Sequence, residues 1–274
     1  MPSNEEYSAP FWLWPNLLSL DAPLVAVLWQ SFLAYRFSVP LPPAAPLVLG
    51  LTVWAVYLLD RLLDARRPPS IDEPARHRFY RLHFRLMLAL LVLVAAADAS
   101  CAVFWLRPVV LRDGLIPFAG VLVYLAMFHI WNPSAKIPKE VAAAILFTAG
   151  TFLTAWTTPR RGTLAWPAVA FFLLCLANMV AIETWEWDET SAQFQLPPIT
   201  RWLARTYLWW VPLAVIACVL EGAITGHSEW YTSIAASAGA CVLLFWFGRR
   251  VPLEARRALV DGVLLSPLLF LMLR

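Results

Sequence analysis

Two groups of acidic side chains could hold a metal ion in a chain that is otherwise strongly apolar. Asp60 and Asp64 are four residues apart in an apolar run, so on a helix they share one face with about 6 Å of rise between them. The second group lies at the end of another apolar run, is preceded by the amide Asn178, and comprises Glu183, Glu186, Asp188 and Glu189. Oxygen ligands of this kind suit Mg²⁺. We therefore expect a Mg²⁺ ion between the two groups.

Basic side chains near both acidic groups supply the opposite charge. Arginine grips phosphate oxygens in bidentate fashion, and lysine acts as a point charge. The candidates for binding a diphosphate are Arg61, Arg67, Arg76, Lys136 and Lys139. Acids, Mg²⁺ and basic groups at the mouth of an apolar, aromatic-rich interior suit an amphiphile that has a diphosphate head and an isoprenoid tail.

The elements that position these residues are membrane helices. The chain of 274 residues is 61% hydrophobic and 14% charged, against roughly 25% charged for an average soluble domain. Such a chain lacks the polar side chains that a water-exposed exterior requires. The 15 Trp and 22 Pro agree, because Trp gathers at the headgroup level and Pro is tolerated in spanning helices. The composition excludes a soluble protein and gives no indication of nucleic-acid binding.

Nine stretches are long and apolar enough to span a bilayer, which takes about 20 residues. We predict an all-α integral membrane protein, a single polytopic domain over residues 1–274 with a bundle around a cytoplasm-facing cavity. The predicted helices are 17–37, 44–63, 84–106, 114–131, 140–157, 164–186, 203–221, 229–248 and 256–273.

The basic residues predict the orientation of the bundle. The even-numbered connections hold 15 of the 21 Lys and Arg residues, and cytoplasmic connections carry the excess of basic residues. The six on the other side are Arg36, Arg107, Arg112, Arg160, Arg161 and Arg274. We therefore predict a protein of the cytoplasmic (inner) membrane, with its N-terminus in the cytoplasm and its C-terminus outside.

The first acidic group resembles a motif of the UbiA-type superfamily of membrane prenyltransferases. Asp60-Arg61-Leu62-Leu63-Asp64 matches the second half of that motif, N-D-x-x-D-R-x-x-D, while Val56 and Tyr57 stand where Asn and Asp are expected. The segment Leu17–Pro23, with Asp21, is similar to the L-x-R-x-D-K-P entry of 4-hydroxybenzoate polyprenyltransferases. Ser19 and Ala22 replace its two basic residues.

Later parts of the chain resemble the same family in part. Lys136 and Lys139 fall where the family places diphosphate-binding Lys or Arg, and Gly150 stands where it places a glycine. The run Asn178–Glu183 is similar to the N-x-x-x-I-E portion of the second motif. The usual Asp is missing there, so that Glu186 or Asp188 would have to replace it.

The resemblance implies a Mg²⁺-dependent intramembrane prenyltransferase. Its substrates would be a prenyl diphosphate and an aromatic or other lipophilic acceptor. Its catalytic residues would be Asp60, Asp64 and Glu183, and its Mg²⁺ ligands would be Asp60, Asp64, Asn178, Glu183 and Glu186. The incomplete motifs leave two alternatives: a catalytically degenerate protein of this fold that binds isoprenoid lipid or serves as a partner subunit, and a small membrane transporter.

Each feature also has an ordinary interpretation that the sequence leaves open. Asp60 and its neighbouring arginines could be charges that snorkel at a helix end. The acids from Glu183 onward could be solvated, and the Arg-rich connection after residue 63 could be a topology signal or a contact with anionic lipid. We expect His129 and His227 to be isolated interfacial residues rather than ligands.

Overall fold

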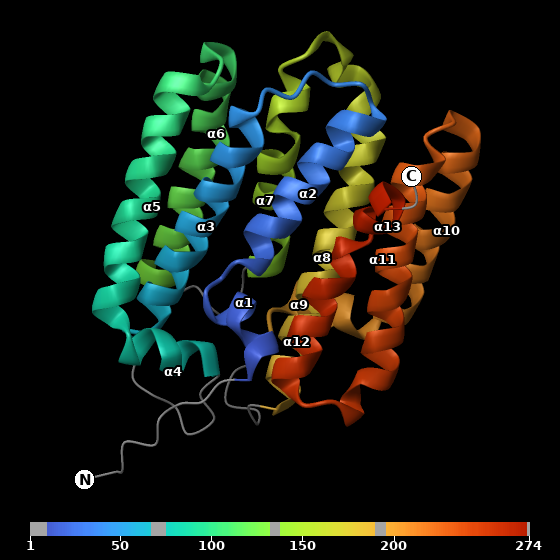
Figure 1. Ribbon diagram of the computed structural model, residues 1–274. Coiled ribbons are helices and arrows are strands. Elements are labelled where there is room, and N and C mark those ends of the chain that lie inside the picture. Colours follow the sequence, from blue (N-terminus) through green and yellow to red (C-terminus); the bar gives the residue numbers. More distant parts are fainter. Residues whose placement is uncertain (1–9, 67–74, 132–137, 190–195, 273–274) are drawn as a thin grey trace.

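The chain folds into a bundle of helices in a computed structural model (Figure 1). The structure describes residues 10–66, 75–131, 138–189 and 196–272. The N-terminal half contains η1 (Phe11–Leu13), α1 (Trp14–Leu17), α2 (Asp21–Arg36), α3 (Ala44–Asp64), α4 (Ala75–Leu82), α5 (Phe84–Trp105), α6 (Pro108–Ala126) and the π-helical turn η2 (Met127–Trp131). The C-terminal half contains α7 (Lys139–Trp156), η3 (Pro159–Leu164), α8 (Ala165–Glu189), α9 (Pro198–Arg205), α10 (Tyr207–Thr225), α11 (Ser228–Phe247), η4 (Gly248–Arg250), α12 (Leu253–Gly262), η5 (Val263–Leu265) and α13 (Pro267–Met272).

Six helices in the described residues are long and apolar enough to cross a membrane, and seven if one bent pair is counted as a span. The six comprise Ala44–Asp64, Phe84–Trp105, Pro108–Ile130, Gly162–Glu189, Tyr207–Thr225 and Ser228–Phe247. They coincide with six of the nine predicted stretches. The prediction of an all-helical integral membrane protein is therefore confirmed.

The other three predicted stretches differ from simple spans. The first, 17–37, corresponds to α2, which is a candidate span only together with residues 11–17. The two segments are bent by 78° at a turn where Ser19 has a positive φ of 54°. The fifth is α7, which has 18 residues and is not among the six. The ninth is divided into α12, η5 and α13.

Hydroxyl groups stabilise the break in the last stretch. Gly262 and Pro267 flank the 3-10 turn, and a broken helix leaves backbone carbonyls without their usual partners. The Ser237 hydroxyl of α11 lies 2.5 Å from the carbonyl oxygen of Val263 and 2.7 Å from the hydroxyl of Ser266, and it donates its single proton to one of them. Ser266 in turn donates to the carbonyl of Ser233 at 2.9 Å.

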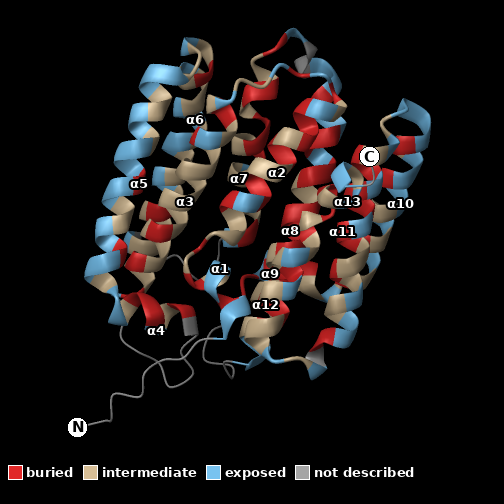
Figure 2. Cartoon of the chain, in the orientation of Figure 1, coloured by how far each residue is buried: buried red, intermediate tan, exposed pale blue. Residues whose placement is uncertain are grey.

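The helices divide into a buried centre and an exposed flank (Figure 2). In the span Gly162–Glu189, 61% of the 18-residue apolar stretch is buried inside the bundle. The corresponding share is 11% in Phe84–Trp105 and in Pro108–Ile130. α5 exposes large apolar side chains along its length, such as Leu93 and Phe104. A surface of this kind is stable in contact with lipid rather than with water.

One short helix, α4, lies at one end of the bundle against α1, α3 and α5. α4 packs the buried rings of Phe79 and Tyr80 inward, and the Tyr80 hydroxyl lies 3.0 Å from the Ser19 hydroxyl. α3 and α8 end at this end of the bundle, and α7 and α12 begin there (Figure 1). We refer to it as the α4 end. It is where the acidic groups of both motifs lie.

Candidate functional site

Asp60 and Asp64 lie on the last turns of α3, one helical turn apart. Both carboxylates approach the Arg61 guanidinium, with Nη1 at 3.8 Å from Asp60 Oδ2 and at 4.0 Å from Asp64 Oδ2. These separations are ion pairs without the short contact of a hydrogen bond. The two side chains are 26% and 16% exposed, so each keeps access to a ligand at the α4 end.

His129 contacts both aspartates, and our expectation that it would be isolated is wrong. Its Nε2 lies 2.9 Å from Asp60 Oδ1, so an N–H at that position donates to the carboxylate. Its Nδ1 lies 3.8 Å from Asp64 Oδ1. His129 comes from the π-helical turn Met127–Trp131, which wraps the backbone more widely than an α-helix. π-helical turns of this kind are frequent at functional sites.

The acids of α8 are paired with basic side chains from three other helices. Glu183 Oε2 lies 2.8 Å from Lys139 Nζ at the start of α7. Glu186 Oε1 accepts from Arg76 of α4 at 2.9 Å and lies 2.7 Å from Arg257 of α12. Arg257 is only 1% exposed. These contacts hold α4, α7 and α12 against the end of α8.

The α3 and α8 groups form one electrostatic network. Arg61 of α3 interacts with Glu186 of α8 as well as with Asp60 and Asp64 of its own helix. Lys139 of α7 interacts with Asp60. Burial, with the charges of Arg76 and Arg61, lowers the pKa of His77 to about 3. His77 is therefore neutral at physiological pH, and its 3.8 Å approach to Asp64 is not an ion pair.

Arg76 remains cationic in this network despite its surroundings. Burial lowers the pKa of its guanidinium to about 10, and the nearby Arg61 acts in the same direction while Glu186 opposes it. A pKa of about 10 leaves the side chain charged at neutral pH. The contact of Arg76 with Glu186 is therefore a true ion pair between α4 and α8.

A deeper polar group lies between α2, α8 and α12. Asn178 donates to the carbonyl of Val260 at 2.9 Å and to Asp261 Oδ1 at 3.3 Å. Asp261 also interacts with Asp21, and Asn16 donates to Asp21 at 2.8 Å. Because α8 is continuous from residue 165 to 189, Asn178 contacts α12 while Glu183 contacts α7. The structure thus separates two side chains that we expected to share one metal ion.

Three predicted site residues remain. Asp188, near the end of α8, interacts with Arg256. Arg67 and Lys136 lie outside the described residues. No group of three or more His, Cys, Asp or Glu side chains in the described part of the chain is arranged to hold a metal ion.

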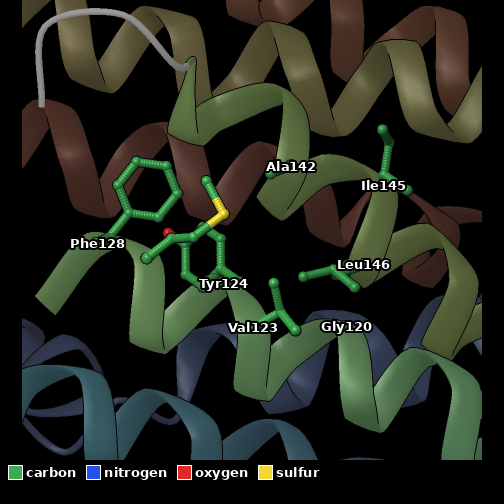
Figure 3. A pocket seen from close by; sticks show the side chains of 8 residues that line it. Gly120, Val123, Tyr124, Phe128, Ala142, Ile145 and Leu146 are labelled. Atoms are coloured by element: carbon green, nitrogen blue, oxygen red, sulfur yellow. The ribbon is translucent and has the colours of Figure 1, made fainter. Parts of the chain in front are cut away.

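An apolar groove of 230 Å³ opens beside the network, between α6 and α7 (Figure 3). Its lining residues are Gly120, Val123, Tyr124, Met127, Phe128, Ala142, Ile145 and Leu146. At Gly120 a Cβ atom would lie 2.8 Å from Leu146 Cδ2, so the two helices approach closely there. Tyr124 interacts electrostatically with Asp60 and Lys139. The groove therefore extends from the exposed flank toward the polar network.

The fold is similar to that of a protein of known structure. The chain is similar to the solved apo structure of a UbiA homolog from Aeropyrum pernix K1, with a TM-score of 0.63 and 14% sequence identity. The likeness covers 92% of this chain and 98% of that one. No family model matches the sequence, and no curated protein matches it. The comparison confirms the predicted UbiA-like fold and leaves activity to be argued from the site.

Proposed function

We propose, from the UbiA-like fold, that this protein transfers an isoprenoid group from a prenyl diphosphate to an aromatic or other lipophilic acceptor. The observation that supports this most is the convergence of Asp60, Asp64, Arg61, Arg76 and Lys139 at one end of an apolar bundle. In this proposal the bent α1–α2 pair, α7 and the broken α12–α13 segment complete nine spanning segments. The α4 end then faces the cytoplasm, and the C-terminus lies outside.

The α3 aspartates fit a Mg²⁺ ion that is shared with a substrate. Mg²⁺ is usually held by one or two carboxylates together with substrate phosphates and water, not by a complete protein cage. Asp60 and Asp64 offer two carboxylates that reach the same histidine and the same arginine. When bound, the ion would neutralise charge on the diphosphate.

The basic side chains of the network would bind the diphosphate and assist its departure. Arg61, Arg76 and Lys139 would hold the diphosphate oxygens and stabilise the charge that develops as the carbon–oxygen bond breaks. The electron-rich acceptor would attack the allylic cation that remains. An aromatic acceptor would then lose a proton and so regain its aromaticity. Exclusion of water by the apolar bundle would protect that cation from hydrolysis.

The test is a paired binding and product assay on the purified protein. Geranylgeranyl diphosphate should raise the melting temperature only when Mg²⁺ is present, and prenylated product should be detected by mass spectrometry with at least one aromatic acceptor. Geranylgeraniol, which lacks the diphosphate, is the matched control and should give no Mg²⁺-dependent stabilisation. Absence of both binding and product would contradict the proposal.

A catalytically degenerate protein of the same fold is the alternative that a specific observation favours. Tyr57 stands in place of an expected acid, and Glu183 and Glu186 are already paired with basic side chains. Such a protein would bind prenyl diphosphate without turning it over. Mg²⁺-dependent stabilisation without product from any acceptor would favour this alternative.

The groove between α6 and α7 should accommodate part of the substrate tail. Its volume of 230 Å³ is smaller than that of pockets for drug-sized ligands, as a site for one stretch of hydrocarbon chain would be. We expect Leu146→Trp to fill the groove and to weaken geranylgeranyl diphosphate binding about tenfold or more, with little effect on geranyl diphosphate. Calorimetric titration of both diphosphates is the measurement.

The neighbouring variant Leu122→Trp controls for the added bulk. Leu122 lies on α6, is 49% exposed and does not line the groove. It should leave both affinities within about twofold of the original protein, as surface substitutions usually do. Equal weakening of the short and the long diphosphate by Leu146→Trp would place the tail elsewhere.

A further inference from the structure

The acids of α8 are matched by side-chain cations within the described residues. Glu183 pairs with Lys139 at 2.8 Å, and Glu186 pairs with Arg76 at 2.9 Å and Arg257 at 2.7 Å. Two further pairs extend the set: Glu189 with Arg256, and Glu254 with Arg257 at 3.1 Å. Four carboxylates thus each have a basic partner, and the fifth, Asp188, also interacts with Arg256.

A divalent ion would have to break these pairs in order to bind α8. Mg²⁺ requires oxygen ligands at about 2.0–2.1 Å in near-octahedral geometry. To coordinate Glu186 it would have to displace Arg257, which is 1% exposed, and Arg76, which is 9% exposed. Arg76 would then be buried without its carboxylate, Arg257 would keep only Glu254, and both guanidinium groups would lie next to another cation, which is strongly unfavourable.

The same two arginines have donors left for an anion. The Nε–H groups of Arg76 and Arg257 are buried and have no acceptor among the described residues. A guanidinium has five N–H donors in a planar fork that matches phosphate geometry. The side chains that Glu186 holds in place therefore combine fixed positive charge with unused hydrogen-bonding capacity.

We propose that Arg76, Arg257 and Lys139, held by the α8 acids, take the place of a second metal ion, so that the diphosphate site binds one divalent ion, at Asp60 and Asp64. This inference rests on the proposed function. It replaces our expectation that Glu183 and Glu186 ligate Mg²⁺. In this arrangement α8 contributes positioning residues, and the arginines contact the diphosphate directly.

Counting bound Mn²⁺ tests the inference without any turnover. Mn²⁺ replaces Mg²⁺ at oxygen sites. Electron paramagnetic resonance measures the Mn²⁺ that remains free in the presence of the full-length protein and inorganic pyrophosphate, and the bound number follows by difference. We expect one Mn²⁺ per chain in the original protein. Glu186→Gln should also bind one, as should the control Glu229→Gln, whose carboxylate pairs with Arg36 at the opposite end of the bundle. Asp60→Asn should bind none.

A conservative change at Arg257 tests its role as a phosphate ligand. Arg257→Lys keeps the charge but loses the planar fork, so pyrophosphate should bind about tenfold more weakly while the Mn²⁺ count stays at one. Arg36→Lys is the matched control and should change neither value. The number of Mn²⁺ ions bound per chain of the original protein tests the inference even if a variant fails to fold.

Each other outcome contradicts a different claim. Two Mn²⁺ per chain, with one lost in Glu186→Gln, would overturn this inference and leave the prenyl diphosphate proposal standing. No binding of Mn²⁺ or pyrophosphate by the original protein would overturn both.

Discussion

Asp60→Asn is expected to lower Mg²⁺-dependent prenyl transfer about 100-fold or more, because a preorganised charge in a dry site contributes at least that much to the rate. The substitution removes one charge and keeps the side-chain volume. An Asn oxygen can still accept from His129 Nε2, which lies 2.9 Å from Asp60 Oδ1. The variant should therefore melt near the original temperature while losing the Mg²⁺-dependent stabilisation by geranylgeranyl diphosphate.

The control for this variant is Asp113→Asn. Asp113 lies near the start of α6, at the opposite end of the bundle, and pairs with the exposed Arg112 at 2.8 Å. The change in charge is the same, and we expect both rate and binding to be unaltered. Initial rates measured over a Mg²⁺ titration separate a lost ion from a lost catalytic group. Unimpaired turnover in Asp60→Asn would contradict the proposed role of α3.

Helix positions could be predicted from apolar length alone, because lipid requires about 20 apolar residues for each span. That rule located α3, α5, α8 and α11 within a few residues. It was less successful for the last stretch, where Gly262 and Pro267 interrupt the helix. Glycine and proline are recognised signals of a helix break, but a prediction from apolar length alone takes no account of them.

The side-chain pairs were predictable only where they are local. Asp60 and Asp64 share a face because helical spacing places them one turn apart. The pair of Glu186 with Arg257 joins α8 to α12, and nothing in the local sequence specifies it. The count of basic residues assigns Arg256 and Arg257 to a cytoplasmic connection, whereas both are buried in the structure.

His129 shows the limit of helical periodicity most clearly. Extending α6 with regular spacing gives this residue no reason to meet Asp60. The π-helical turn Met127–Trp131 changes the register by lengthening the hydrogen-bonded ring. No residue type in that turn predicts such a change. The contact follows from tertiary packing at the α4 end, which a single sequence does not display.

Trp29→Ala is expected to destabilise the bundle by about 3–5 kcal/mol, the usual cost of truncating a large buried aromatic side chain. Trp29 is fully buried. Its ring centroid lies 5.1 Å from those of Phe171 and Trp230, so it joins α2 to α8 and α11. Its indole N–H donates to the carbonyl of Leu264 at 2.8 Å, which stabilises the break between α12 and α13. Reversible unfolding in mixed micelles would measure the loss.

Two further tryptophan variants separate the causes of that loss. Trp29→Phe keeps an aromatic ring in the cluster but leaves the Leu264 carbonyl without its donor, which costs about 1–3 kcal/mol in a buried setting. Trp209→Ala removes an equal side chain from α10 that is 75% exposed, and should change stability by about 0.5 kcal/mol or less. Equal destabilisation by Trp29→Ala and Trp209→Ala would contradict a packed core around Trp29. Because the hydrogen bond to Leu264 anchors the segment that carries Asp261 and Arg257, Trp29→Phe should also weaken pyrophosphate binding through a displaced α12.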